Sequence, residues 1–354
     1  WGIEKLSLAE RHYKVLMAGV DQFGGNNVAQ PILDAYQMGV KEHGEKWMRQ
    51  RMEQSAVRLL RNIFRTGLFE NPYLDPAATK ATVGNPGFMK EGYEAQLKTQ
   101  VLLKNKGNVL PIKGRKTVYV PKKFTPASVN FLGVKTPEKL DYPVNMELVK
   151  KYFDVTDDPT KADLALVFIE SPKSGIGYDS TDIKADGNGY LPISLQYNDY
   201  TATDARATSI AGGDPKEATN NRSYKGKTVK TSNVTDLGMV TETAAKMKGK
   251  PVIVSVAVDN PLVFSEFEKQ SDAILVNFRV QDQAVLDIIT GKVEPSGLLP
   301  FQMPTSMSEV ERQAEDAPHD MKCHKDSEGH SYDFGFGMNW KGVIKDERVG
   351  KFKK

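Results

Sequence analysis

The chain has 354 residues, of which 39% are hydrophobic and 26% are charged, and its 48 basic and 45 acidic residues give a formal net charge of +3. This length exceeds a typical single domain, so we expect two. The balanced charge, without a stripe dense in Lys and Arg, argues against nucleic acid as a partner. No apolar run approaches the ~20 residues that span a bilayer, which argues against a membrane partner.

Cys323 is the only cysteine, so the chain can form neither an intrachain disulfide nor a thiolate metal cluster. The spacing of His319, His324 and His330 around it fits no zinc pattern, and the glycine pairs lack the context of a phosphate-binding loop. We therefore expect no metal and no cofactor. The cysteine count leaves the cytoplasm and the bacterial periplasm open.

The first 75 residues have a mainly helical pattern. Ser7 and Glu10 have the spacing of a capping box. The apolar segment AGVDQF at 18–23 predicts a short strand, and residues 40–64 predict one amphipathic helix that ends near Gly67. We interpret 1–70 as the last part of a domain whose beginning lies upstream, since the chain opens on Trp-Gly-Ile-Glu without an initiator Met.

Residues 71–92 are rich in Pro, Gly, Ala and Thr and predict an interdomain linker. In the following domain, 93–340, helical patterns alternate with nearly wholly apolar strand patterns, which is typical of a parallel sheet covered on both faces. Strands are predicted at 117–120, 162–169, 251–258 and 273–278, and helices at 94–104, 146–152, 261–269 and 283–289. Residues 341–354 form a basic tail, which we interpret as a solvated end.

The segment 164–190 is the first candidate for a functional site. An apolar strand at 164–169 is followed by a loop of Gly, Ser, Asp and Lys, and ligands of open α/β sheets bind beyond the carboxyl ends of the strands. The same loop opens an insertion at about 177–236, which is dominated by Thr, Asn, Asp, Gly and Lys. Five tyrosines in the insertion favour an ordered excursion that makes contacts.

Five segments in order resemble glycoside hydrolase family 3. PSGLLPFQMP at 295–304, VLLKNKGNVLPI at 101–112 and YDFGFGMNW at 332–340 are similar to motifs of the family's second domain. LMAGVDQF at 16–23 and RTGLFENPY at 65–73 resemble segments near the end of its barrel domain. The resemblance implies the C-terminal end of a TIM barrel followed by a six-stranded α/β/α sandwich, with the active site between the two domains.

In such an enzyme a carboxylate nucleophile and a second carboxyl group cleave the glycosidic bond with retention. The resemblance places the nucleophile, an Asp, before Trp1, so we expect an N-terminal barrel segment to supply it as a companion. Trp1 is expected either as an aromatic wall of the sugar site or as a buried structural residue. Asp21 is expected to face the site or to bond backbone at the strand end. Phe23, Ile176 and Tyr178 are expected to contact substrate.

The acid/base residue should come from the loop after the strand at 164–169. Many family members carry SGEGY there, whereas this chain reads SGIGY at 174–178, so Ile176 occupies the place of the proton-donating Glu. Glu170, Asp179 and Asp182 are the nearby replacements. A donor would need a pKa raised by apolar surroundings, to which Ile176 could contribute.

The function implied by the resemblance is that of an exo-acting retaining β-glycosidase, most simply a β-glucosidase, acting on an oligosaccharide or β-glycoside and active only together with the N-terminal segment. The alternative is a non-catalytic sugar-binding relative of the family, which the isoleucine in place of the donor favours. We expect the protein in the bacterial periplasm or outside the cell.

Overall fold

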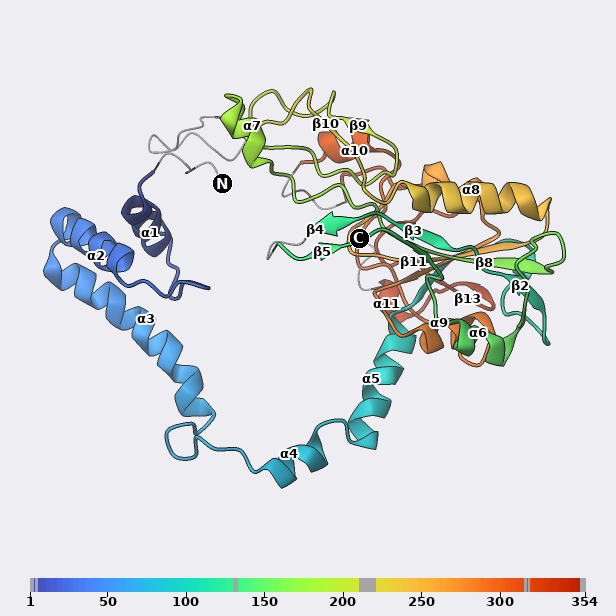
Figure 1. Cartoon of the computed structure of the whole chain (residues 1–354), viewed down its shortest axis with the longest axis horizontal. Coiled ribbons are helices and arrows are strands. Elements are labelled where there is room, and N and C mark those ends of the chain that lie inside the picture. Colours follow the sequence, from blue (N-terminus) through green and yellow to red (C-terminus); the bar gives the residue numbers. More distant parts are fainter. Residues whose placement is uncertain are drawn as a thin grey trace. The chain divides into compact units, whose positions relative to one another are not determined.

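The computed structural model describes residues 3, 6–129, 133–209, 221–314, 317 and 319–350. Across this described part of the chain, every helix is too short or too polar to cross a lipid bilayer. The chain forms two compact units (Figure 1). The first comprises Trp1–Pro86, Ser180–Gly189 and Thr208–Arg222, and the second comprises Gly87–Asp179, Tyr190–Ala207 and Ser223–Lys354.

Helices dominate the first unit: α1 (Leu8–Met17), α2 (Gln30–His43), α3 (Glu45–Arg65), α4 (Pro76–Thr82) and α7 (Ser180–Lys184). The predicted capping box is confirmed, because the Ser7 hydroxyl accepts the Glu10 N–H while the Glu10 carboxylate accepts the Ser7 N–H. The predicted single helix at 40–64 is wrong. Gly44 has a φ of 89° and separates α2 from α3, a conformation that glycine adopts without strain.

The predicted strand at 18–23 is also wrong, since these residues form a turn and irregular backbone. A strand persists only when its N–H and C=O groups are paired with a neighbour, and among the described residues of this unit no strand is available. The predicted linker 71–92 contains α4 and the start of α5 (Pro86–Thr99). The helix predicted at 94–104 therefore begins earlier and ends earlier, because Val101–Asn105 belongs to a strand.

A mixed sheet is the centre of the second unit, with the order β14-β13-β1-β12-β11-β8-β2-β7. β12, β11, β8, β2 and β7 run parallel, whereas β1, β13 and β14 add to one edge in antiparallel pairs. The strand bounds are β1 Val101–Asn105, β2 Thr117–Tyr119, β7 Asp154–Val155, β8 Leu164–Glu170, β11 Val252–Ala257, β12 Ala273–Asn277, β13 Met338–Asn339 and β14 Gly342–Val343.

This sheet corrects two predictions. It has eight strands in the described chain, not six, because short strands with no long apolar pattern extend both edges. The segment predicted as a solvated tail from 341 contributes β14 and the short helix α11 (Glu347–Gly350), and Ile344 is buried. The four strands predicted from apolar runs are confirmed as β2, β8, β11 and β12 to within two residues at each end.

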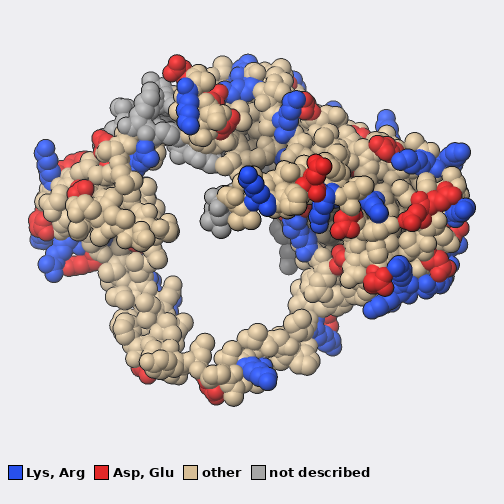
Figure 2. Space-filling model, in the orientation of Figure 1, with Lys and Arg blue, Asp and Glu red and all other residues tan. Residues whose placement is uncertain are grey.

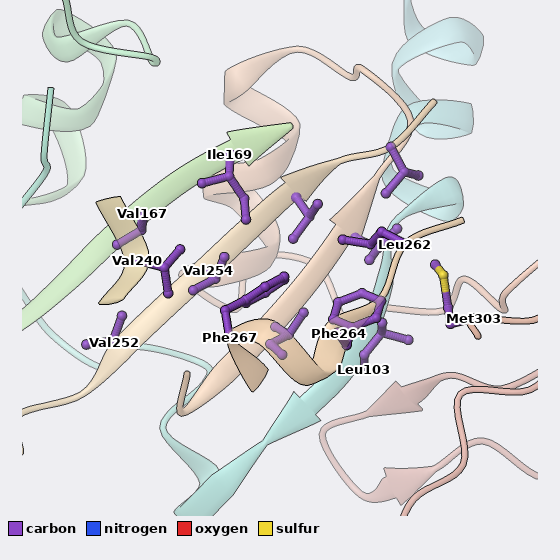
Figure 3. Close-up of a cluster of buried hydrophobic side chains, with 14 of the residues drawn as sticks. Leu103, Val167, Ile169, Val240, Val252, Val254, Leu262, Phe264, Phe267 and Met303 are labelled. Carbon is purple, nitrogen blue, oxygen red and sulfur yellow. The ribbon is translucent and has the colours of Figure 1, made fainter. Parts of the chain in front are cut away.

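Helices lie on both faces of the sheet (Figure 1). α8 (Thr235–Met247) packs on one face with the buried cluster that includes Val167, Val254 and Phe267, shown in Figure 3. α6 (Met146–Tyr152) and α9 (Asp282–Ile289) pack on the other face with Leu166, Ile253 and Leu275. The predicted helix at 261–269 forms two 3-10 turns instead, η2 (Phe264–Glu266) and η3 (Glu268–Gln270).

Several smaller elements surround this sheet. β3 (Lys123–Thr125) pairs with β6 (Lys139–Asp141), and β4 (Ser128–Val129) pairs with β5 (Lys135–Thr136). Within the predicted insertion, β9 (Tyr200–Thr201) pairs with β10 (Thr228–Val229), and Tyr197 is fully buried. The remaining elements are η1 (Lys106–Asn108) and α10 (Met307–Arg312). Figure 2 shows Lys, Arg, Asp and Glu intermingled on the visible face of the second unit.

Candidate active site

Glu170, the last residue of β8, lies at the centre of an ionic network. Its carboxylate is 2.6 Å from Lys123 Nζ, 2.9 Å from Lys173 Nζ and 2.9 Å from Arg279 Nη1. These three cations come from β3, from the loop after β8 and from the turn after β12. Glu170 therefore ties together segments that are far apart in the sequence at the carboxyl end of the parallel strands.

The pKa of Glu170 makes it a poor proton donor. Partial burial by itself would raise the pKa, but the hydrogen bonds and charges of Lys123 and Lys173 lower it from the ordinary 4.5 to about 2. A general acid must hold a proton near the working pH. The surroundings of Glu170 therefore favour its charged form.

Asp236 binds the same lysine as Glu170 and is fully buried. Its Oδ2 accepts hydrogen bonds from Lys123 Nζ at 2.9 Å and from the Glu170 N–H at 3.0 Å, whereas its Oδ1 has no partner among the described residues. Burial raises its pKa, and the charge of Lys123 opposes that rise. The two carboxylates share one lysine, which holds β3 against the end of β8.

Asn233 clamps the backbone that leaves β8. Its Nδ2 donates to the carbonyl oxygens of Glu170 at 3.3 Å and Ser171 at 3.2 Å, and its Oδ1 accepts the Lys173 N–H at 2.8 Å. Asn233 is 5% exposed, so water competes little for these bonds. The first residues of the loop are therefore held in one path.

The SGIGY segment continues this path with two glycines in the left-handed region. Gly175 has a φ of 93° and Gly177 a φ of 75°, and a Cβ on Gly177 would press on Ile193. Ser174 Oγ donates to the Ser194 carbonyl oxygen at 3.0 Å and accepts the Ser194 N–H at 2.8 Å. Ile176 is 66% exposed, so within the described residues it does not form the apolar surroundings expected for a donor.

Tyr178 and Tyr190 close the rest of the loop. They form an isolated antiparallel bridge, and their rings meet edge to face with centroids 5.8 Å apart. Asp179 follows directly and is half-buried. Asp182 lies in α7, where its Oδ2 accepts the Gly189 N–H at 2.7 Å and the carboxyl group packs on Gly187, leaving no room for a Cβ there. The Asp182 carboxylate thus stabilises the turn that follows it.

The expected site residues of the first unit contact their own unit. The Asp21 carboxylate accepts hydrogen bonds from Ser55 Oγ at 2.7 Å and Arg58 Nη1 at 3.1 Å, and these bonds lower its pKa. Asp21 therefore bonds side chains of α3, not the strand-end backbone considered from the sequence. Phe23 packs on His12 with ring centroids 4.7 Å apart. Trp1 lies outside the described residues.

The sequence reasoning missed Lys123, Asn233, Asp236, Asp259 and Arg279. Arg279 has a φ of 56°, which is unusual for a residue other than glycine, and its guanidinium pairs with Asp259. The sequence offers only weak signals for these residues. They are polar residues at the ends of apolar strand patterns and an acidic residue at the start of a helical pattern. Only the fold shows that they converge on Glu170.

The fold and the loop define an α/β unit whose candidate site lies beyond the carboxyl ends of parallel strands. Residues 201–340 match the model of the glycosyl hydrolase family 3 C-terminal domain. The chain is 28% identical over 340 residues to "Probable beta-glucosidase C" of Aspergillus flavus, covering 96% of this chain and 42% of that protein. It is 26% identical over 340 residues to "Periplasmic beta-glucosidase/beta-xylosidase" of Dickeya chrysanthemi, covering 96% and 40%.

The structure is similar to that of a beta-glucosidase from Listeria innocua in complex with isofagomine, with a TM-score of 0.54 and 17% identity over 94% of this chain and 44% of that one. This likeness concerns the fold. The chain spans about two fifths of the length of the curated relatives that it matches. Together these findings confirm the resemblance to the C-terminal portion of glycoside hydrolase family 3.

Replacing Glu170 with Gln is expected to lower the free energy of unfolding by about 1–2 kcal/mol at pH 7, less than the full pKa shift implies because the carboxylate is partly exposed. The pKa of Glu170 is lowered in the folded state from 4.5 to about 2. Its stabilisation is therefore complete above pH 4.5 and is lost as the pH falls towards 2. Urea unfolding between pH 2.5 and 7 would measure this, with Glu138→Gln as an exposed control. An equal pH dependence in E170Q and the parent would contradict it.

Proposed function

We propose that the protein to which this chain belongs is an exo-acting retaining β-glycosidase, most simply a β-glucosidase. The observation that carries the proposal is the match of residues 201–340 to the family 3 C-terminal domain, combined with the clamped glycine-rich loop after β8. The chain corresponds in this proposal to the end of the barrel domain and to the second domain.

The reaction would proceed in two steps. An Asp on the segment upstream of Trp1 would attack the anomeric carbon, and a carboxyl group of this chain would protonate the leaving oxygen; water would then release the sugar. We assign the proton transfer to Asp179. Asp179 is half-buried and follows directly on the Tyr178–Tyr190 bridge that fixes the loop, whereas the cations around Glu170 hold that carboxylate charged.

Two relatives bear the word "periplasmic" in their names, from Dickeya chrysanthemi and Salmonella typhimurium. We infer the same kind of compartment, or secretion, for this protein. A substrate there would be a soluble β-glycoside or an oligosaccharide fragment, which suits an enzyme that removes one terminal sugar at a time.

The whole protein is expected to hydrolyse both an aryl β-glucoside and the unactivated disaccharide cellobiose, because a proton donor assists departure of the poor leaving group. Steady-state rates on the two substrates test this. Hydrolysis of the aryl glucoside alone would indicate that no carboxyl group replaces the missing Glu. Absence of both activities would exclude the proposed enzyme, provided that the protein is folded by circular dichroism.

One observation favours a second candidate, a sugar-binding relative without catalysis. Ile176 stands where the family's donor is expected, and its side chain is 66% exposed. An exposed apolar side chain at this place would pack on a sugar but cannot carry a proton. This candidate predicts binding of cellobiose by calorimetry with neither substrate hydrolysed.

A further inference from the structure

A pocket of about 400 Å³ lies at the carboxyl ends of β8, β11 and β12, wholly within the second unit. This volume falls within the range of about 300–1,000 Å³ that is typical of small-molecule sites. Its wall includes residues of β3, β6 and α9 as well as the three strand ends. The pocket thus occupies the place where open α/β sheets bind their ligands.

The pocket begins where one face of the sheet changes from apolar to polar. On the face covered by α6 and α9, Ile253 and Leu275 belong to the buried cluster, and Ser255 and Asn277 follow them towards the carboxyl ends. On the opposite face the same strands stay apolar, with Val256 and Val276. Since burial of polar groups costs free energy, a polar end on one face alone needs a local reason.

The hydrogen bonds inside the pocket supply only part of that reason. Asn277 Oδ1 accepts the Arg279 N–H at 3.0 Å, which stabilises the left-handed backbone of Arg279. Asn277 Nδ2 donates to Ser255 Oγ at 3.1 Å. Ser255 is 3% exposed, and among the described residues its hydroxyl hydrogen has no acceptor. A buried donor therefore points to a partner that would enter from the pocket.

The charges around the pocket favour a neutral ligand. Lys123 is shared between Glu170 and Asp236. Arg279 is shared in the same way between Glu170 and Asp259. Lys123 and Arg279 are thus already neutralised, so an anion would gain little from them. The other charged residues of the wall, Lys139 and Asp282, are of opposite sign. Tyr142 and Phe168 contribute apolar surface beside these donors and acceptors.

We propose that this pocket binds a neutral polyhydroxylated ligand, a single sugar ring, with Ser255 Oγ donating to one of its oxygens. A sugar presents hydroxyl groups along its edge and C–H groups on its faces, which matches a pocket with polar strand ends and an aromatic wall. The choice of glucose as the sugar rests on the proposed function, whereas the pocket itself does not.

Calorimetric titration of the whole protein with methyl β-glucoside tests the proposal. Ser255→Met, whose side chain would extend into the pocket, is expected to lower the number of sugars bound by one. Ser255→Ala removes the donor without filling space and is expected to weaken that site's affinity about 3- to 10-fold. Ser271→Ala is the matched control, since Ser271 is also buried but precedes β12 at the other end of the strand; it should bind like the parent.

An unchanged number of bound sugars in S255M would overturn the proposal, as would binding of inorganic phosphate that S255M abolishes. Hydrolysis of an aryl β-glucoside is measured on the same samples. If the parent protein does not hydrolyse the aryl glucoside but binds a sugar that S255M no longer binds, only the proposed enzyme is contradicted. If the parent protein hydrolyses the aryl glucoside and S255M binds as many sugars as the parent, only the proposed sugar site in the pocket is contradicted.

Discussion

Asp179→Asn is expected to lower kcat on cellobiose about 10²- to 10⁴-fold in the whole protein, the range that a positioned general acid contributes. Hydrolysis of an aryl glucoside with a good leaving group should fall much less, because its first step needs little protonation. Sodium azide should restore the rate on the aryl substrate by attacking the glycosyl-enzyme in place of activated water. Steady-state kinetics on both substrates, with and without azide, measure the effect.

Asp186→Asn is the matched control for this experiment. Asp186 lies on the same loop and is exposed, and its φ of 63° is one that Asn also tolerates. It should retain the parent's kcat. If Asp179→Asn behaved like this control while Asp182→Asn lost activity with azide rescue, the donor would be Asp182 and our assignment would be wrong.

Glu268→Gln is expected to lower the free energy of unfolding of the second unit by about 3–5 kcal/mol, because it leaves Lys104 charged and unpaired in the interior. The side chains of Lys104 and Glu268 form an ion pair and are 1% and 3% exposed. Ser327 Oγ also donates to the Glu268 carboxylate, at 2.8 Å, and Gln keeps that acceptor. The substitution therefore removes the negative charge but keeps the hydrogen bond from Ser327. Urea denaturation measures the effect on the free energy of unfolding.

The exposed pair Lys246–Glu242 provides the control. Its atoms are 3.2 Å apart and its side chains are 53% and 69% exposed, so Glu242→Gln should change stability by less than about 0.5 kcal/mol. Replacing both members of the buried pair, with Lys104→Met and Glu268→Leu, should recover part of the loss. A cost of under 1 kcal/mol for Glu268→Gln would show that water solvates Lys104.

The apolar strands were the part of the fold that the sequence predicted best. Runs such as VIVSVAV leave little choice, since only a strand buried on both faces suits so many β-branched residues. Short strands near the sheet edge, such as β13 and β14, escaped prediction, because two residues carry no periodicity. The strand expected at 18–23 failed for the related reason that strand formation depends on a neighbour, which local sequence does not specify.

The candidate site was predicted in part. The position of the loop after β8 followed from a strand pattern and a change in composition. Glu170 was considered as a donor because a carboxylate at a strand end is well placed. Lys123 lies 47 residues earlier and Arg279 109 residues later in the chain, yet both bind its carboxylate, and Lys123 lowers its pKa. No local pattern indicates such partners.

The loop that follows Leu164–Glu170 shows most clearly which features the sequence determines and which depend on the tertiary structure. The sequence by itself determined that a buried strand leads into a glycine-rich segment, that Ile176 occupies the expected donor's place, and that family 3 motifs run along the chain. Only the tertiary structure decided which carboxylates are held charged and where a polar pocket opens. Hydrophobic pattern is a local property of the chain, whereas pKa and pocket shape depend on side chains that the folded sheet brings together from distant segments.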